Sequence, residues 1–220
     1  MHNLWKRPQA YLVRHGETVL NKSNCWRGWQ NPVLNEAGEA AAEAIQNFFS
    51  YEEIGKVVSS DLTRAMQTAQ YVLDTGNVVI PYVSPDPNLR SWAIGGFAGM
   101  EKTKANIAKF EYYVNHDTEV IPETNYGLPG ESLQQFRERN NCILDYVLNP
   151  VQGLPTVIVV HTSNITAFHR MVHELEDNNE EVADIIEPGG IIGVYVDTDG
   201  NIDIKALMGE TNSETTPEAS

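Results

Sequence analysis

Continuous apolar runs alternate along the chain with stretches whose apolar residues recur at helical spacing. The continuous runs predict buried strands over residues 10–13, 57–59, 80–83 and 156–160. The helical spacing predicts amphipathic helices over residues 36–50, 61–73, 131–148 and 164–176. Strands that alternate with helices in this way predict an α/β fold, a three-layer sandwich with a mostly parallel central sheet and helices on both faces.

Some segments depart from this alternation. Residues 84–130 combine scattered proline and glycine with several aromatic side chains, and only a helix near 101–114 is predicted there. We expect this segment to be an inserted lid over one end of the sheet that sets specificity. Near the C-terminus, residues 190–196 and 201–206 predict a hairpin-like pair of strands. Residues 209–220 have almost no apolar content and predict a disordered acidic tail.

Composition and charge narrow the class of protein. The length of 220 residues fits one domain over residues 1–208, with the lid as its insertion. The chain has 15 Lys and Arg residues and 30 Asp and Glu residues, which gives a net charge of −15. This charge disfavours binding to nucleic acid or to an anionic membrane. No apolar run approaches the roughly 18 residues that span a bilayer. The first ten residues lack the apolar core of an export signal, and Cys25 and Cys142 are too few for a disulfide framework. We therefore expect a cytoplasmic protein.

Two histidines follow the two most strand-like runs of the chain. His15 comes after Arg14 at the end of the first predicted strand, and His161 comes directly after the last central one. Arg64 lies at the start of the helix that follows the second strand. Ligands of open α/β sheets bind at the carboxyl ends of the strands. We expect two guanidinium groups and two imidazoles to meet there, where the planar fork of arginine matches the oxygens of a phosphate.

The sequence around these groups contains five short blocks in a characteristic order. The set comprises Arg14-His15-Gly16-Glu17-Thr18 with Asn21 three residues on, GWQNPVLNEAG at 28–38, SSDLTRAMQTA at 59–69, Gly130-Glu131-Ser132, and VIVVH at 157–161. In this order the blocks resemble the histidine phosphatase (phosphoglycerate mutase-like) superfamily, over most of residues 10–195. The resemblance implies the fold predicted above.

The resemblance also implies a mechanism. His15 would be the nucleophile, a neutral imidazole that takes the phosphoryl group on one ring nitrogen. Arg14, Arg64 and His161 would bind the phosphoryl oxygens and stabilise charge in the transition state. Further contacts to the substrate are expected from Asn21, Gly16, Thr18 and Thr162. No metal and no cofactor is expected, because the cationic side chains take the part that magnesium plays in other phosphotransferases.

The general acid of the family is missing from its usual places. Many members carry a glutamate in a segment that resembles 89–99 here, and Ser91 occupies its position. Another branch carries an aspartate directly after the second histidine, where this chain has Thr162. A serine hydroxyl is no acid near neutral pH, so another group must protonate the leaving oxygen, or none does. Glu131 is the first candidate and Glu101 the second, and a capping or loop-fixing role for Glu131 stays open beside the catalytic one.

Three functions remain open at this point. The first is a metal-independent phosphatase that hydrolyses phosphate monoesters through a phosphohistidine on His15. The second is a phosphoglycerate mutase-type phosphotransferase, and the third is a phospho-ligand binding protein that lacks a general acid. The expected partner is a small phosphorylated substrate or a phosphoprotein rather than nucleic acid or membrane, and a homodimer stays open.

Other aromatic and histidine residues carry weaker signals. Trp26, Trp29 and Trp92 either line a substrate mouth or belong to the core, where large aromatic residues are common. His169 and His173 lie four residues apart on a predicted helix, a spacing that binds metals. Since the sequence offers no third ligand near them, we interpret them as surface or packing residues.

Overall fold

The computed structural model describes residues 7–124, 127–174 and 186–210. Its centre is a six-stranded sheet with the order β3-β2-β4-β1-β5-β6. The strands are β1 (Ala10–Arg14), β2 (Lys56–Ser59), β3 (Val83–Pro85), β4 (Thr156–Val160), β5 (Ile186–Val196) and β6 (Ile202–Glu210). Strands β3, β2, β4 and β1 run parallel, whereas β5 is antiparallel to β1, and β6 to β5. The predicted mostly parallel sheet and the C-terminal hairpin are therefore confirmed.

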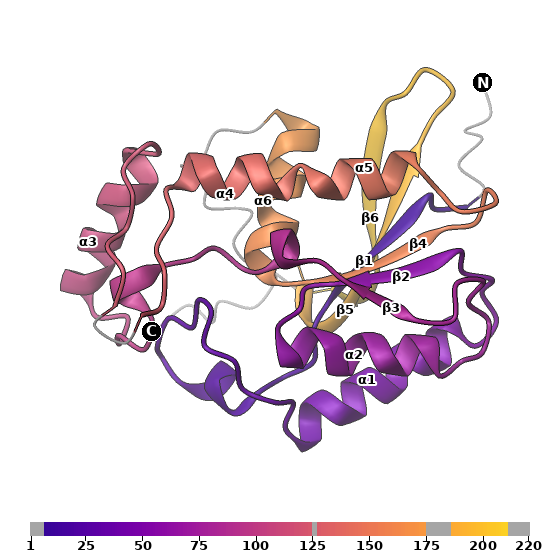
Figure 1. Cartoon of the computed structure of the whole chain (residues 1–220), viewed down its shortest axis with the longest axis horizontal. Helices are drawn as coiled ribbons and strands as arrows, with labels where there is room; N and C mark the ends of the chain where they lie inside the picture. The colour runs from indigo at the N-terminus through magenta and orange to yellow at the C-terminus, as the bar shows by residue number, and fades with distance from the viewer. Residues whose placement is uncertain (1–6, 125–126, 175–185, 211–220) are drawn as a thin grey trace, which may run out of the picture.

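Helices cover both faces of this sheet (Figure 1). They are α1 (Glu36–Phe49), α2 (Thr63–Leu73), α3 (Lys104–Asn115), α4 (Leu133–Asn140), α5 (Cys142–Leu148) and α6 (Thr162–His173). Helices α1 and α2 pack on one face, and α5 and α6 pack on the other (Figure 1). Helix α3 lies beyond the end of the sheet, where the predicted lid was expected (Figure 1). Of the helices in the described ranges, none is both long and apolar enough to cross a membrane.

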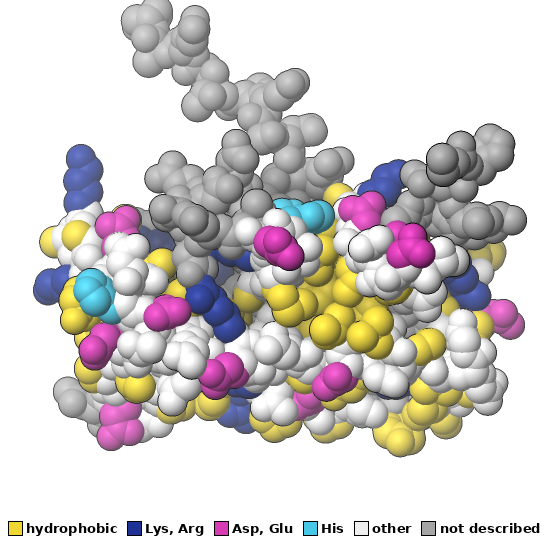
Figure 2. Space-filling view, turned by 90° about the horizontal axis from the view of Figure 1, so that it is seen from above, with side chains coloured by type: hydrophobic (Ala, Val, Ile, Leu, Met, Phe, Trp, Pro, Cys, Tyr) yellow, Lys and Arg dark blue, Asp and Glu magenta, His cyan; other side chains and the backbone are white. Residues whose placement is uncertain are grey.

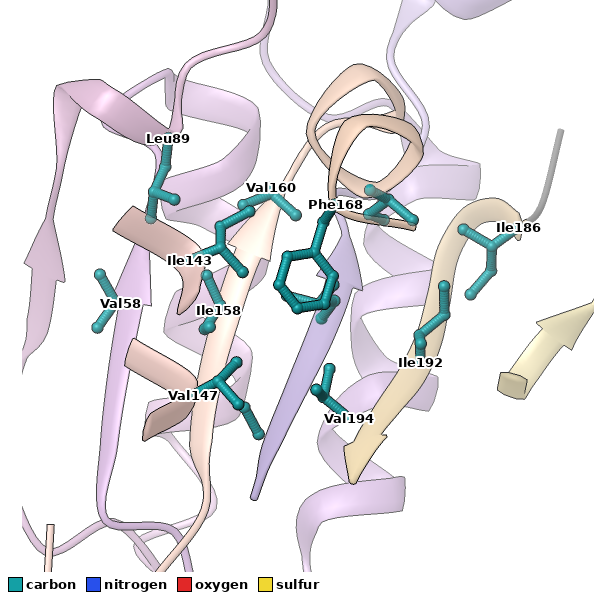
Figure 3. Packing of buried hydrophobic residues seen from close by; sticks show 13 residues of the cluster. Val58, Leu89, Ile143, Val147, Ile158, Val160, Phe168, Ile186, Ile192 and Val194 are labelled. Carbon is teal, nitrogen blue, oxygen red and sulfur yellow. The ribbon is translucent and has the colours of Figure 1, made fainter. Parts of the chain in front are cut away.

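Each face of the sheet builds its own apolar cluster. Because successive side chains of a strand point to opposite faces, Ile158 and Val159 of β4 enter different clusters. Ile158 packs on the α5 and α6 side with Ile143 and Phe168, and all three are buried (Figure 3). Val159 packs on the α1 and α2 side with Phe49. The central strands are buried on both faces, which explains why their sequences are continuously apolar.

The predicted strand over 80–83 is wrong in place. The strand that pairs with β2 is β3, which begins only at Val83. Pro81 has no N–H to donate to a strand ladder, and the N–H of Ile80 donates to Gly55 O, just outside β2, at 3.1 Å. The pairing therefore starts two residues after the proline.

The predicted helix over 131–148 is two helices, α4 and α5, separated at Asn141. Helix α4 begins after Ser132, whose hydroxyl accepts from the N–H of Gln135 as an N-cap. At the junction the side chain of Asn140 is buried and donates to Asn164 O on α6. This bond ties the end of α4 to α6, and the helix continues as a separate segment.

Other boundaries move by a few residues. The helix expected near 101–114 is α3, which begins after the N-cap Thr103. The helix expected over 164–176 begins at Thr162 and ends at His173, because Glu174 adopts a left-handed conformation with φ of 52°. Residues 175–176 lie outside the described residues. The expected disordered tail over 209–220 is wrong at its start, since Gly209 and Glu210 belong to β6, and the rest lies outside the described residues.

Two glycines bring the loop after β1 against the first turn of α1. A Cβ on Gly16 would lie 2.4 Å from Gly38 O, and a Cβ on Gly38 would lie 2.0 Å from Glu17 O. Both distances are to backbone atoms, which no side-chain rotation relieves. This close approach fixes the position of the segment that carries His15.

We expect Gly38→Ala to lower the free energy of unfolding by about 1–3 kcal/mol, although alanine is the better helix former. The cause is the overlap between the new methyl group and the carbonyl oxygen of Glu17. Denaturant unfolding measures it, with Gly96→Ala as the matched control. A Cβ on Gly96 meets only Pro122 O at 3.6 Å, an ordinary contact, so that variant should stay near the wild type. Equal stabilities of the two variants would contradict the argument.

Candidate active site

The parallel pairing of β1 and β4 places the two strand-end histidines side by side. Arg14 pairs with Val160 in the sheet, so the next residues, His15 and His161, emerge together. Their ring centroids are 5.0 Å apart, and the two residues are only 4% and 3% exposed. The structure thus brings together the imidazoles that the sequence placed at separate strand ends.

The ring of His15 is held at both nitrogens. Its Nδ1 lies 2.7 Å from Gly16 O, and its Nε2 lies 3.1 Å from Nε of Arg64. Because a carbonyl only accepts and a guanidinium only donates, Nδ1 carries the proton and Nε2 presents its lone pair. Burial, together with the charges of Arg64, Arg14 and Arg27, holds the pKa of His15 well below 6.5 against the opposing bond to Gly16. His15 is therefore a neutral imidazole with Nε2 free of a proton.

Arg64 is the cation next to this lone pair. It stands in the first turn of α2, is 2% exposed, and donates from Nη1 to Gln30 O at 2.8 Å and from Nη2 to Gly28 O at 3.4 Å. Burial, with a smaller contribution from the charge of Arg27, lowers its pKa from 12.5 to about 10. The group is still a cation at neutral pH, and the two carbonyls fix its plane beside His15.

One ring nitrogen of His161 has a hydrogen-bond partner and the other has none among the described residues. Its Nε2 lies 2.9 Å from Oγ of Ser60, whereas its Nδ1 is buried and has no hydrogen-bond partner in the described parts of the chain. Burial first, and then the charge of Arg64, holds the pKa of His161 well below 6.5. An unpartnered buried nitrogen is costly, so Nδ1 of His161 has a hydrogen-bonding requirement that the described residues do not meet.

The pKa depression at both histidines predicts a pH-dependent stability. Each takes up a proton on unfolding near pH 6.5, so their stabilisation is present above that pH and is lost as the pH falls toward the folded-state values. We expect the free energy of unfolding to fall by about 2 kcal/mol for the pair between pH 6.5 and 5.5. Denaturant unfolding of the wild type against the His15→Gln, His161→Gln double variant isolates this part, and parallel pH profiles for the two proteins would contradict it.

A cavity of about 260 Å³ opens over these groups. It is lined by His15, Trp26, Arg27, Gly28, Arg64, Ser91, Trp92, Ile94, Phe110, His161, Thr162 and Ser163. The lid residues expected over 84–130 contribute Ser91, Trp92, Ile94 and Phe110 to this wall. Trp26 and Trp92 therefore face the cavity and also pack in an aromatic cluster, while Trp29 instead donates from Nε1 to Ser91 O.

Arg27 is a cavity residue that the sequence reasoning missed. It directly precedes the block at 28–38 and lines the cavity beside His15 and Arg64. Burial lowers its pKa, and its charge contributes to the lowered pKa values of His15 and Arg64. Its Nη1 donates a hydrogen bond to Leu20 O at 3.3 Å. Its position directly before Gly28, the first residue of that block, was the sequence feature that could have identified Arg27 as a site residue.

The remaining sequence candidates lie around the cavity rather than in it, apart from Thr162, which lines it. Arg14 is buried, donates to Ile186 O, and acts on both histidines through its charge. Gly16 supplies the carbonyl that holds His15. Asn21 uses Oδ1 to accept from the N–H and the hydroxyl of Thr18, at 3.0 and 2.7 Å. These bonds shape the loop, and a substrate contact by Asn21, Thr18 or Arg14 stays a prediction.

Neither candidate acid lies at the cavity. Glu131 forms a bidentate ion pair with Arg139, at 2.6 and 2.8 Å, and accepts from the N–H of Ala93 at 2.8 Å. Arg139 in turn donates to Ser91 O, so the pair fixes the segment beside the cavity. Glu101 is exposed. The contacts of Glu131 are those of the loop-fixing alternative, because a role as acid would require breaking the pair with Arg139.

The charges of the surface and of the site differ in sign. Figure 2 shows many Asp and Glu side chains spread over one face, with fewer Lys and Arg among them. The cavity, by contrast, is lined by Arg27 and Arg64, and none of the described residues that line it is Asp or Glu. The site is a local positive focus within an acidic protein.

His169 and His173 lie on α6 with ring centroids 4.5 Å apart. Across residues 7–124, 127–174 and 186–210, no group of three or more His, Cys, Asp or Glu side chains is placed to hold a metal ion. The two imidazoles therefore have no third ligand in the part of the chain that the structure describes.

The sheet, the paired imidazoles and the arginines define an α/β protein with a cationic cavity at the carboxyl ends of its parallel strands. The family model described as "Histidine phosphatase superfamily (branch 1)" matches residues 10–201, and the chain belongs to this superfamily. The resemblance drawn from the sequence blocks is thus confirmed.

Individual relatives carry several names. "Probable phosphoglycerate mutase GpmB" of Yersinia enterocolitica is 30% identical over 157 residues, covering 70% of this chain and 69% of that protein. "Phosphoglycerate mutase-like protein 4" of Arabidopsis thaliana is 30% identical over 164 residues, covering 73% and 69%. The solved structure of a mycobacterial glucosyl-3-phosphoglycerate phosphatase in complex with VO3 matches with a TM-score of 0.69 at 21% identity, covering 92% of this chain and 98% of that chain. The last likeness concerns the fold alone.

Proposed function

We propose that the protein is a metal-independent phosphatase that hydrolyses phosphate monoesters through a phosphohistidine on His15. The observation that carries the proposal is the state of the His15 ring, with Nδ1–H held by Gly16 O and an unprotonated Nε2 at the wall of a cationic cavity. An imidazole in this state is a competent nucleophile at neutral pH.

The reaction takes two displacements. In the first, Nε2 attacks phosphorus, an N–P bond forms, the ester P–O bond breaks, and the leaving oxygen takes a proton from solvent. In the second, water attacks phosphorus, the N–P bond breaks, and phosphate departs while water loses a proton. When phosphorus takes the lone pair of Nε2, the Nε–H of Arg64 loses its acceptor there and turns to a phosphoryl oxygen. Arg27 and His161 line the same cavity, and we expect them to stabilise the other oxygens.

Phosphoglycerate mutase-type transfer is the second candidate, and the names of the two sequence relatives favour it. It shares the first displacement, but a substrate hydroxyl replaces water in the second. A phospho-ligand binding protein is the third, favoured by the position of Glu131 away from the cavity.

The acceptor that finally receives the phosphoryl group distinguishes the three candidate functions. Purified protein is given a labelled phosphate ester, with and without 3-phosphoglycerate, and the labelled products are quantified. For a phosphatase we expect inorganic phosphate at a rate that the acceptor does not change. Label in an organic bisphosphate or a new phosphoglycerate isomer would establish the mutase instead, and saturable binding with neither product would establish the binding protein. His116→Ala, which changes an exposed histidine on the C-cap of α3, is the matched control for His15→Ala.

A further inference from the structure

A second, larger cavity adjoins the catalytic one. It has a volume of about 780 Å³ and is lined mainly by residues of α3, α4 and α6. Four residues line both cavities, namely Trp92, Phe110, Thr162 and Ser163. The two cavities therefore adjoin along these four residues, which places the larger cavity next to a ligand that has its phosphate at His15.

The wall of the larger cavity is mostly apolar and aromatic. Trp92 and Phe136 are nearly parallel, with ring centroids 6.2 Å apart and an interplanar angle of 18°, and Phe110 lies 5.1 Å from Trp92. Val114, Leu133, Ala167 and Met171 complete the apolar side, and the charged lining residues are Arg137, Arg170 and Glu174. Flat aromatic rings are the groups that such walls bind best.

Trp92 is fixed in place before any ligand arrives. Its backbone N–H donates to Oγ of Ser163 at 3.2 Å, and its indole Nε1 donates to the backbone oxygen of Glu131 at 3.2 Å. The carboxylate of Glu131 is itself held by Arg139. A wall that is already ordered loses little conformational entropy on binding, so its apolar area contributes to affinity.

The chemistry of the catalytic cavity points to the same class of substrate. Its described lining holds no carboxyl group that could protonate a leaving oxygen. A phenol has a pKa of about 10, whereas an alkyl alcohol is close to the value of roughly 16 for water, so an aryl oxide leaves without a general acid far more readily. The absence of a carboxyl group from the described lining of the catalytic cavity and the aromatic wall of the larger cavity thus both favour aryl over alkyl phosphate esters.

We propose that the larger cavity binds the aromatic part of the substrate, and that the substrates are aryl phosphate monoesters whose ring system is larger than a single phenyl. This rests on the proposed function. As the N–P bond to His15 forms, the aryl O–P bond breaks, and the aryl oxide leaves with its electron pair and takes a proton from solvent. The volume of about 780 Å³ falls within the range of sites that enclose ligands of this size.

Hydrolysis of three esters tests the substrate class. The kcat/KM for 2-naphthyl phosphate should exceed that for phenyl phosphate by about tenfold, mainly through KM, because the second ring enters the apolar cavity. Both aryl esters should exceed hexyl phosphate by a larger factor through kcat. Equal kcat/KM values for the naphthyl and phenyl esters, or a preference for hexyl phosphate, would overturn the inference while leaving phosphatase activity established.

Filling the cavity gives the matched variant. Ala167→Trp adds a large side chain to the wall of the larger cavity only, and we expect it to lower kcat/KM for the naphthyl ester to the level of phenyl phosphate. Met171→Trp, at a 38% exposed position on the same wall, is the second variant if the first fails to fold. Val79→Trp adds the same side chain at an exposed site outside the cavity and should behave as the wild type. An unchanged preference in the folded cavity variants would overturn the assignment.

Binding measurements keep the test independent of catalysis. Should no ester be hydrolysed, the proposed function fails, and calorimetry then compares 2-naphthylmethylphosphonate with methylphosphonate on the wild type and on Ala167→Trp. We expect binding of the naphthyl compound to be at least about tenfold tighter in the wild type and not in the variant. Equal affinities of the two phosphonates for the wild type would overturn the cavity assignment itself.

Discussion

Replacing His15 with alanine is expected to lower kcat/KM for phosphate esters by about 10⁴-fold or more, because the variant has no group to form the covalent intermediate. The loss should fall on kcat. The fold should survive, since the neighbouring Arg64 keeps its bonds to Gln30 O and Gly28 O. Steady-state kinetics on wild type, His15→Ala and His116→Ala measure the effect.

Added imidazole offers a second readout of the same variant. His15→Ala leaves a space at the wall of the cavity, and a free imidazole that binds there can accept the phosphoryl group in place of the missing ring. We expect part of the activity to return in proportion to the imidazole concentration, and His161→Ala should show no such rescue through a nucleophile. If His15→Ala keeps more than about a tenth of the wild-type kcat, His15 is not the nucleophile.

Replacing Arg64 with alanine is expected to lower kcat/KM by about 10²–10³-fold, the usual cost of losing one donor to a developing charge. Arg64→Lys should recover only part of it, because an ammonium cannot keep the bonds to Gln30 O and Gly28 O while a third donor faces His15. Arg7→Ala, at a surface arginine paired with Glu52, is the control.

The pH profile distinguishes this role from a structural one. The charge of Arg64 is the second contribution, after burial, to the low pKa of His15. Its removal should therefore raise the pKa of His15 toward 6.5, and the acid limb of kcat/KM should move to higher pH in Arg64→Ala. An acid limb that stays in place, or activity within about threefold of the wild type, would contradict the role assigned to Arg64.

Much of the fold could be predicted because its elements carry local signals. The apolar runs of β1 and β4 are continuous, since both strands are buried on two faces, and the periodicity of α1 is clear over 36–50. The misplaced strand at 80–83 and the single helix at 131–148 failed for another reason. Their ends depend on partners far along the chain, Lys56–Ser59 for β3 and Asn164 for the end of α4.

The site residues likewise fall into those that the sequence could predict and those that it could not. His15, Arg64 and His161 could be found because they stand next to strands and within recognisable blocks. Arg27 lies in a loop, and only packing makes it a cavity residue. The pairing of Glu131 with Arg139 spans the start of α4, so the sequence could show that Glu131 opens a helix but not that a guanidinium already holds it.

The partner of His161 illustrates the limit most clearly. Ser60, which holds Nε2 of His161, lies 101 residues earlier in the chain. Only the β2–β4 pairing brings the ends of those strands together. A motif can thus nominate a nucleophile, while the hydrogen bonds that set the state of each ring depend on the strand pairing of the sheet.

The most direct measurement of the central claim is the trapping of the intermediate. Protein mixed with a phosphate ester is quenched in alkali within one turnover, and ³¹P NMR and peptide mass spectrometry locate the phosphoryl group. We expect an acid-labile, alkali-stable phosphoryl group on Nε2 of His15, absent from His15→Ala and present in His116→Ala. Turnover of the ester with no phosphoryl group on His15, or with one on another residue, would contradict the account.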